Sequence, residues 1–595
     1  MTDLKRRHRS QTFIYCPQGD YMRSITTAAL LAGLMCAAPV FGADANAGKA
    51  VFRAQCALCH SAEPGDNGGA QGPNLNGVFG RHSASNSAFG YTAALKASGL
   101  TWDAATLNRF LTSPTTVVPG SAMVIPVPDN NERANLIAYF QAVKAGTFKS
   151  TTPNFAGPGG PPPMPPGSNK PVKGFDDWKN DTPGRVHRID LAKLPAPFDT
   201  PSSAKFPKFV PKPAGAAVKL PPGFEMTVFA SDVPSARKML LAANGDILIS
   251  EPQNSKVSVM HPSADGTHVE TITTFAQGLN LPYGLAFYPN ASNPQWLYVA
   301  ETNRLVRYAY KTGDSQASAV PEVVVPQLSP VAGGGHFTRD VAFSLDLKKM
   351  YVSVGSQSNV AEDMPKKTAD EIRAWEAAHG LGAAWGNEEN RANVLVFDVG
   401  SKAPGKVYAS GIRNCVSLTV QPGSGALWCT TNERDMLGDD LVPDYSTRVQ
   451  EGKWYGWPWY YMGNHEDPRH AGERPDLAGK VTSPDVPYQA HSASLGLVFY
   501  TATDGASAFP KEYVGDAFTT FHGSWNRAFR TGHKVVRVRM KNGVPTGEYD
   551  DFLVGFIVDD GNAWGRPVGL LVNKDGSLLL SDDGANVVYR IAYKH

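Results

Sequence analysis

The sequence has little of what would tie it to a polyanion or to a lipid bilayer. Charged residues make up 18% of its 595 residues and the net charge is +2. This composition gives no electrostatic reason to expect nucleic acid or a membrane surface as a partner. Only Ala28–Ala38 forms an apolar run near the N-terminus, and it is too short to span a bilayer. We therefore expect no transmembrane segment after removal of the N-terminal signal.

The N-terminal segment has the features of a targeting signal rather than of a folded element. Met22 and Arg23 open a short basic region, the apolar run follows, and small residues near Ala43 offer cleavage points. We predict that residues 1–43 are a presequence and that the protein is exported to the periplasm. The remaining chain is too long for one core, so two or more domains are expected.

Two thiols and a histidine stand together in Cys56-Ala57-Leu58-Cys59-His60. This spacing is the attachment signature of c-type haem, in which the cysteines bind the vinyl groups and His60 ligates the iron. A chance pair beside a surface histidine is one alternative. A thioredoxin-like redox pair is another, but no βαβ pattern surrounds the motif. The motif therefore predicts one covalent haem c.

A second axial ligand is available in Met123, which follows the turn at Pro119 and Gly120 and precedes a predicted helix over 131–140. A lone methionine is more often core filler. Here residues 44–148 resemble class I cytochromes c, and further matching motifs are Gly72-Pro73-Asn74-Leu75, Gly80-Arg81, Tyr91 and Trp102. The resemblance implies that the Pro73 carbonyl orients His60, and that Arg81, Tyr91 and Trp102 bind a haem propionate.

Residues 149–220 are rich in proline and begin with a run from Gly157 to Gly167 that cannot bury a core. We interpret the run as a semi-rigid linker and residues 171–220 as an arm packed on the next domain, with a disordered extension as the alternative. Cys415 and Cys429 flank a turn farther along. An oxidising compartment would allow a disulfide, but a perfect hairpin register does not place the two opposite each other, so the pairing stays open.

From residue 221 to 595 one theme recurs: an apolar strand, a tight polar turn and a second apolar strand. Five copies are clear, and a sixth is predicted around Ala493–Val538. Such repetition is typical of a β-propeller with loop insertions, and a β-sandwich array is the alternative. We predict an all-α cytochrome domain followed by an all-β six-bladed propeller, closed by pairing of Phe224–Phe229 with Val587–Ile591.

The propeller region resembles the soluble glucose/sorbosone dehydrogenases, which use pyrroloquinoline quinone (PQQ). The motifs that carry the resemblance stand at the strand entrances: Gly333-Gly334-Gly335-His336-Phe337-Thr338-Arg339-Asp340, Gly411-Ile412-Arg413-Asn414, Asn432-Glu433-Arg434-Asp435, His522-Gly523-Ser524-Trp525-Asn526-Arg527 and Trp564-Gly565-Arg566. By resemblance, His336 is the general base and Arg413 stabilises the charge that forms on the quinone. An isolated histidine is more often a core residue, but its position at a strand mouth favours the catalytic role.

The resemblance also implies a Ca²⁺ ion that clamps the cofactor through backbone carbonyls, by position those of Arg434 and Asp435. The glucose dehydrogenases have small residues there, so this part of the pattern departs from the family. The remaining residues expected to contact PQQ are Arg237, Arg339, Asn414, Trp525, Arg527, Trp564 and Arg566.

Together these features predict a periplasmic quinohaemoprotein that oxidises a sugar or an aldehyde with PQQ. Electrons would pass singly to the haem and on to a soluble cytochrome or the respiratory chain. One alternative is that the propeller is a non-catalytic module that binds a partner dehydrogenase. A propeller hydrolase is a third possibility, but it would have little reason to carry haem.

Overall fold

The structure is a computed structural model of the chain. It describes residues 43–56, 60, 62, 72–86, 91–121, 123, 126–127, 129–148, 178–203, 205–330, 335–362 and 364–595. Cys59, Gly333 and Gly334 from the predicted motifs, residues 1–42 of the predicted presequence 1–43 and the glycine-proline run all lie outside the described residues. No helix among the described residues is long and apolar enough to cross a membrane.

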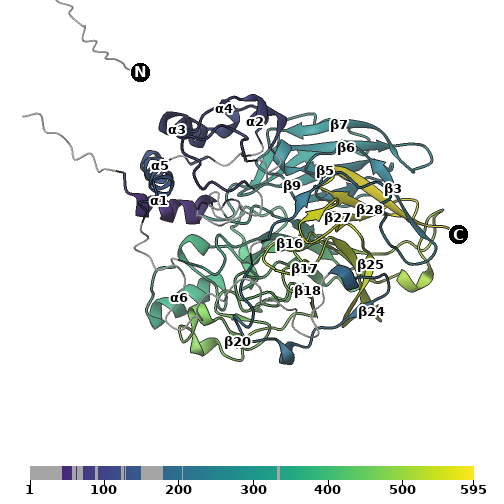
Figure 1. Ribbon diagram of the computed structural model, residues 1–595. Coiled ribbons are helices and arrows are strands. Elements are labelled where there is room, and N and C mark those ends of the chain that lie inside the picture. Colours follow the sequence, from purple (N-terminus) through teal and green to yellow (C-terminus); the bar gives the residue numbers. More distant parts are fainter. Residues whose placement is uncertain are drawn as a thin grey trace, which may run out of the picture. The chain divides into compact units, whose positions relative to one another are not determined.

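The first described part is helical (Figure 1). Its elements are α1 (Ala45–Val51), a π-helical turn (Phe52–Cys56), α2 (Ala93–Ala97), α3 (Ala104–Thr112), α4 (Pro114–Val117) and α5 (Asn130–Lys144). Aspartates cap three of the helices: Asp44, Asp103 and Asp129 accept hydrogen bonds from backbone N–H groups of the first turn.

Helices α1 and α5 pack closely because Gly48 faces α5. A Cβ atom on Gly48 would lie 1.9 Å from the carbonyl oxygen of Asn135, so only glycine allows this approach. Phe52 packs on Tyr139 and Phe140, with ring centroids 5.6 and 5.9 Å away. This apolar core fixes the turn that carries Cys56, which is itself buried.

Six antiparallel sheets of four strands each form the second part, with β1 (Val186–His187) added to the edge of one sheet. We call them blades 1 to 6 in chain order. Blade 1 holds β4 (Met239–Leu241), β5 (Ile247–Glu251), β6 (Lys256–Pro262) and β7 (Val269–Gln277); blade 2 holds β8 (Leu285–Tyr288), β9 (Trp296–Ala300), β10 (Leu305–Ala309) and β11 (Glu322–Val325); blade 3 holds β12 (Val341–Phe343), β13 (Lys349–Val354), β14 (Asn393–Asp398) and β15 (Lys406–Ser410).

The later blades follow the same order. Blade 4 holds β16 (Cys415–Val420), β17 (Leu427–Thr431), β18 (Tyr445–Arg448) and β21 (Val486–Pro487); blade 5 holds β22 (Ser494–Phe499), β23 (Ala517–Phe521), β24 (Lys534–Lys541) and β25 (Val544–Leu553); blade 6 holds β27 (Pro567–Val572), β28 (Leu578–Asp582), β29 (Val587–Tyr593) and β3 (Phe224–Ala230). The predicted sixth copy is therefore confirmed as blade 5.

The ring closes as the sequence predicts. Strand β3, from the start of the propeller region, pairs antiparallel with β29 at its end, with Met226 opposite Ile591. The first strand of each blade contacts the first strand of the next: β4 with β8, β8 with β12, β12 with β16, β16 with β22, β22 with β27 and β27 with β4. These strands therefore surround the ring axis, and the six-bladed propeller is confirmed.

Cys415 and Cys429 form a disulfide, which settles the pairing that the sequence left open. The register of β16 against β17 shifts between Cys415 and Ser417, so a bulge replaces the perfect hairpin. The Cα atoms of the two cysteines lie 5.7 Å apart, within the range that a disulfide requires.

Residues 178–220, the described part of the predicted arm, lie along the propeller. Strand β1 pairs with β25, and β2 (Lys208–Phe209) pairs in parallel with β26 (Asn562–Ala563). Between them the backbone N–H of Lys205 donates to the carbonyl of Trp525, at 2.7 Å. The arm thus contacts loops of blade 5 and the connection to blade 6.

Candidate active site

The site residues gather at one end of the ring, which we call the mouth. Because the strands are antiparallel, the end where each first strand begins is also the end where each second strand stops. The mouth therefore combines the residues before β4, β12, β16, β22 and β27 with the loops that follow β13, β17, β23 and β28. Arg237, His336, Arg339, Arg413 and Arg566 come from the first group; Asn359, Asp435, His522 and Asp583 come from the second.

His336 stands in the mouth as a neutral imidazole. Its Nδ1 lies 3.0 Å from the carbonyl oxygen of Ser356, and since a carbonyl only accepts, Nδ1 carries the proton. Burial and the nearby charge of Arg413 hold the pKa of His336 well below its usual value. The other ring nitrogen, Nε2, is therefore unprotonated at neutral pH and can accept a proton.

Arg413 lies close to His336, but its hydrogen bonds are already committed. Nε donates to the Asn359 carbonyl, Nη1 donates to the carbonyls of Asn432 and Glu433, and Nη2 donates to the side chains of Asn359 and Asp435. All five N–H groups thus have acceptors within the protein. Arg413 can act on a ligand through its charge, whereas a direct hydrogen bond would require one of these acceptors to be exchanged.

His491 is a member of this cluster that the sequence analysis did not identify. Its Nε2 donates to the Gly438 carbonyl at 2.9 Å, and its Nδ1 lies 3.4 Å from Oδ1 of Asp435. Burial opposes the charged form, but the hydrogen bond and charge of Asp435 outweigh it, so the pKa of His491 is raised. Burial likewise opposes ionisation of Asp435, but His491 and Arg413 lower its pKa. The two therefore form a buried ion pair.

Two arginines and a neutral histidine surround Asp583. Arg237 Nη2 lies 2.5 Å from Oδ2 of this carboxylate, His522 Nε2 donates to Oδ1 at 2.9 Å, and Arg566 Nε is 3.8 Å away. Burial and the charge of Arg566 lower the pKa of His522 to about 3, so it stays neutral. Arg237 also lies over the ring of Phe337, 5.9 Å from its centroid, and so stands beside the His336 segment.

Several cationic groups of the mouth have donors without acceptors. The buried Nε atoms of Arg237, Arg339 and Arg527 make no hydrogen bond among the described residues. Burial and the nearby guanidinium of Arg391 lower the pKa of Arg339. A buried N–H group without an acceptor is costly, and an anion with several oxygens would supply acceptors for such donors. The residues present therefore fit a multiply charged anion such as PQQ.

Other predicted contacts lie elsewhere. Trp564 donates from Nε1 to the Gly555 carbonyl and packs edge-on against Phe556 in the core of blades 5 and 6. Trp525 stacks on Phe206 of the arm, with ring centroids 5.0 Å apart. Arg527 pairs with Asp440 at 2.6 Å, and the buried side-chain oxygen of Asn414 makes no hydrogen bond with any residue that the structure describes.

The predicted calcium position does not fit the ion. The Asp435 carbonyl already accepts from Arg469 Nη1 at 2.8 Å and from Asn359 Nδ2 at 3.1 Å. The Arg434 side chain is fully buried between Glu433 and Asp467 and serves the core of the loop. Of the predicted ligand pair Arg434 and Asp435, we therefore correct the Asp435 carbonyl, which a cation already occupies, while the Arg434 carbonyl stays a prediction.

Of the predicted haem-binding residues Cys56, Cys59, His60 and Met123, the structure describes all but Cys59. His60 Nδ1 donates to the Pro73 carbonyl at 2.9 Å, the hydrogen bond that the resemblance implies. A Cβ on Gly72 would lie 2.3 Å from the His60 ring, so glycine is needed there. Burial lowers the pKa of His60, which keeps the imidazole neutral as a ligand. Met123 packs against the helical core.

Among the residues predicted to contact a haem propionate, Arg81 keeps one buried N–H group available for an acceptor. Arg81 donates from Nη2 to the Asn74 carbonyl at 2.9 Å and from Nη1 to the Asn76 carbonyl at 3.2 Å, while its buried Nε makes no hydrogen bond within the described part of the chain. Its charge lies close enough to oppose the rise that burial causes in the pKa of Tyr91. Trp102 is buried, with its ring 4.9 Å from that of Phe110. These residues fit a haem carboxylate.

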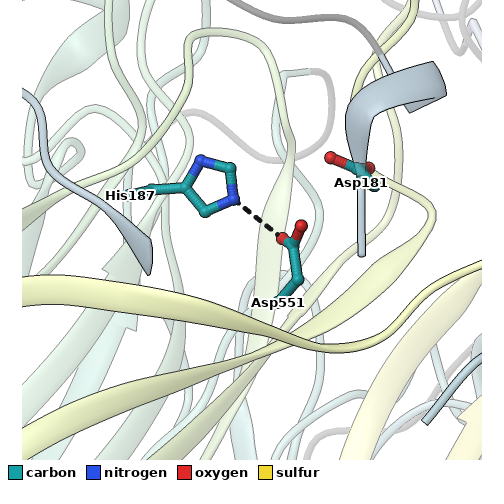
Figure 2. A group of neighbouring side chains, drawn as sticks. All are labelled: Asp181, His187 and Asp551. Carbon is teal, nitrogen blue, oxygen red and sulfur yellow. Dashed lines mark hydrogen bonds and ion pairs between the residues drawn. The ribbon is translucent and has the colours of Figure 1, made fainter. Parts of the chain in front are cut away.

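A separate group of metal-type ligands joins the arm to blade 5. Figure 2 shows Asp181 and His187 from the arm facing Asp551, with His187 Nε2 3.0 Å from its carboxylate. The ammonium of the fully buried Lys534 lies 2.8 Å from Asp181 and 2.7 Å from Asp551. The position of a metal ion is therefore taken by Lys534, and the cluster is an internal ion-pair network.

The fold and the site define a PQQ-dehydrogenase-like propeller with a cationic mouth, preceded by a cytochrome c domain. The family model described as TrAA12-like matches residues 218–452 and 468–594, and the cytochrome c model matches residues 45–144. The chain therefore belongs to the TrAA12-like family and carries an N-terminal cytochrome c.

Relatives match each part separately. An uncharacterized protein of Borreliella burgdorferi is 27% identical over 387 residues, which are 64% of this chain and 92% of the relative. Cytochrome c2 of Rhodoblastus acidophilus is 44% identical over 107 residues, 18% of this chain and 98% of the relative.

Solved structures share the propeller fold. The holo form of the pyranose dehydrogenase PQQ domain from Coprinopsis cinerea has 19% identity and a TM-score of 0.51, and the match covers 64% of this chain and 98% of that one. The calcium structure of the family AA12 carbohydrate-active enzyme of Trichoderma reesei has 18% identity and a TM-score of 0.51, covering 69% and 99%.

Proposed function

We propose that the protein is a dehydrogenase that oxidises a sugar or an aldehyde, of aldose or sorbosone type, with PQQ bound in the mouth. The observation that carries this proposal is the neutral His336, held through Nδ1 with Nε2 unprotonated, beside buried arginines whose donors lack acceptors. The family of the chain supports a sugar oxidoreductase. PQQ, when bound, supplies a two-electron acceptor that takes a hydride from the substrate carbon.

The chain's own residues supply the proton chemistry and the binding. His336 Nε2 removes the proton of the substrate hydroxyl as the hydride leaves the same carbon, so the substrate loses one proton to His336 and one hydride, which carries the two electrons. The charge of Arg413 favours the reduced, more negative state of the site. Arg237, Arg339 and Arg566 bind carboxylates of the cofactor.

Electron transfer continues to haem c, held by Cys56, Cys59, His60 and Met123. Haem, when bound by these residues, would supply a one-electron acceptor, so two electrons from the mouth would have to leave singly. We further propose that the protein acts in the periplasm and reduces a soluble cytochrome or a respiratory-chain acceptor. Calcium is not part of the proposal, because Arg469 and Asn359 occupy the Asp435 carbonyl.

The test is turnover with a panel of aldoses and aldehydes after addition of PQQ to the full-length protein, followed by haem reduction. The variant His336→Gln removes the base while keeping a polar side chain, and kcat/KM should fall by about 100- to 10,000-fold, the usual contribution of a general base. PQQ affinity should change little, because His336 is not proposed to bind its carboxylates.

His261→Gln is the matched control, since His261 lies on β6 and pairs with Asp246 away from the mouth. Its turnover should equal that of the unaltered protein. Full activity of His336→Gln would contradict the assigned base. Failure of the unaltered protein to bind PQQ would favour the alternative in which the propeller only binds a partner.

A further inference from the structure

The loop of residues 432–444, between β17 and β18, presents its carbonyl groups to cationic side chains. Arg413 donates to the carbonyls of Asn432 and Glu433, and Arg469 donates to that of Asp435. Farther along, His491 donates to Gly438 and Arg527 to Asp439. Five backbone oxygens of this loop thus already accept from arginine or histidine side chains.

Arg469 is built into this arrangement. Its Nε and Nη2 form a paired contact with the Asp467 carboxylate, at 2.9 and 2.7 Å, while Nη1 reaches the Asp435 carbonyl. Asp467 is fully buried and also accepts from Arg434 at 3.4 Å. If Arg469 turned away, it would leave part of a buried carboxylate unpaired, so its position is strongly favoured.

The Asp435 carbonyl has no capacity left for a metal ion. A carbonyl oxygen has two lone pairs, and here Arg469 and the Asn359 amide use both. A calcium ion binds oxygens at about 2.3–2.6 Å, so an ion on this oxygen would stand directly against the guanidinium of Arg469. The two like charges would repel each other.

We propose that fixed guanidinium groups replace the calcium ion in this cofactor site. Arg469 occupies the Asp435 carbonyl, Arg413 holds the neighbouring carbonyls, and together they supply the positive charge that a divalent ion would otherwise bring. PQQ then binds without a divalent cation. This inference rests on the proposed function, since it concerns the loading of the same site.

The experiment uses the full-length protein freed of metals and PQQ. PQQ is titrated in excess EGTA and, separately, with added CaCl₂, and binding is followed by quenching of tryptophan fluorescence. Metal content is measured after each titration. We expect equal dissociation constants in the two buffers, within about twofold, and no calcium retained in the PQQ complex.

The variant Arg469→Ala separates an electrostatic role from a merely structural one. It frees the Asp435 carbonyl, so PQQ binding in EGTA should weaken by at least about tenfold and calcium should restore part of the loss. A structural role alone would not create a calcium dependence. Arg448→Ala is the control, because Arg448 lies on β18 of the same blade and pairs with Asp485; it should bind PQQ normally in both buffers.

Outcomes distinguish this inference from the proposed function. If the unaltered protein bound PQQ tightly only with calcium, the inference would be overturned while the dehydrogenase proposal stood. If PQQ bound in neither buffer, both would be overturned. Should Arg469→Ala fail to fold, the titrations of the unaltered protein decide the question alone.

Discussion

At the scale of single residues, the chemistry depends on protonation states fixed by burial. His336 and His491 lie in the same cluster and share Asp435 as a charged neighbour, yet their pKa values move in opposite directions. His336 loses its proton because burial and Arg413 oppose the charge, whereas His491 keeps its proton because Asp435 pairs with it. In the proposed reaction the neutral His336 is therefore suited to accept a proton, whereas pairing with Asp435 favours the charged form of His491.

The pH dependence of turnover should report this difference. Because the pKa of His336 is held well below 6.5, the base remains unprotonated as the pH falls from 8 to 6, and kcat/KM should stay level over this range. The loss of rate should appear only when the pH falls through the lowered pKa. A profile measured by haem reduction checks this, and a midpoint near 6.5 would show that the titrating group is an ordinary exposed histidine.

Some site residues could be predicted from the sequence because they stand directly before an apolar strand. His336 and Arg413 are examples. The segment Ala490-His491-Ser492 stands before β22 in the same way, so His491 could have been predicted too. Asn359 and Arg469 could not be found in this way. They lie inside long insertions and reach Asp435 from 76 and 34 residues away, so only the folded blades bring them together.

At the scale of elements, the arm is anchored to the propeller by both charge and aromatic contacts. Phe206 stacks on Trp525, and Phe209 lies 5.3 Å from the guanidinium of Arg566. Two of the residues expected to contact the cofactor are thus held by the arm. The sequence indicated an arm by its scattered aromatics, but the pairing partners are more than 300 residues away and left no local pattern.

Lys534 should be the main electrostatic anchor of the arm. Lys534→Met would leave Asp181 and Asp551 buried without a counter-charge, which typically costs about 3–5 kcal/mol. We expect a lower melting temperature of the propeller, followed by the near-ultraviolet circular dichroism of its tryptophans, and faster proteolysis of residues 178–220.

Lys349→Met provides the comparison, since Lys349 forms an exposed pair with Asp398 on blade 3. Its melting temperature should match that of the unaltered protein. Equal stability of the Lys534 and Lys349 variants would mean that the buried cluster of Figure 2 does not anchor the arm.

The strands themselves were predictable because each blade repeats a local pattern. Turns such as Asn244-Gly245-Asp246 and Lys574-Asp575-Gly576 separate apolar strands, and each pair became the first two strands of a blade. The insertions of residues 355–392 and 449–485 follow no period. Helix α6 (Ala369–His379) lies in the first of them and begins at a capping box formed by Thr368 and Glu371, which was not recognised in the sequence.

At the scale of the whole molecule, two redox domains share one chain. A two-electron oxidation in the mouth requires a carrier that removes electrons one at a time, and the cytochrome c domain is such a carrier. If the proline-rich segment is the linker that the sequence predicts, it would keep the two domains at a high effective concentration, and transfer between them should not depend on collisions between molecules.

The most direct test of this account is a single-turnover experiment with the PQQ-loaded protein, mixed with excess sugar in the absence of oxygen and of other acceptors. The visible band of reduced haem should appear with a rate constant that is independent of protein concentration, and it should be absent in His336→Gln over the same time. Haem that stayed oxidised while the sugar was consumed, or that was reduced at a rate proportional to protein concentration, would contradict electron transfer within one chain.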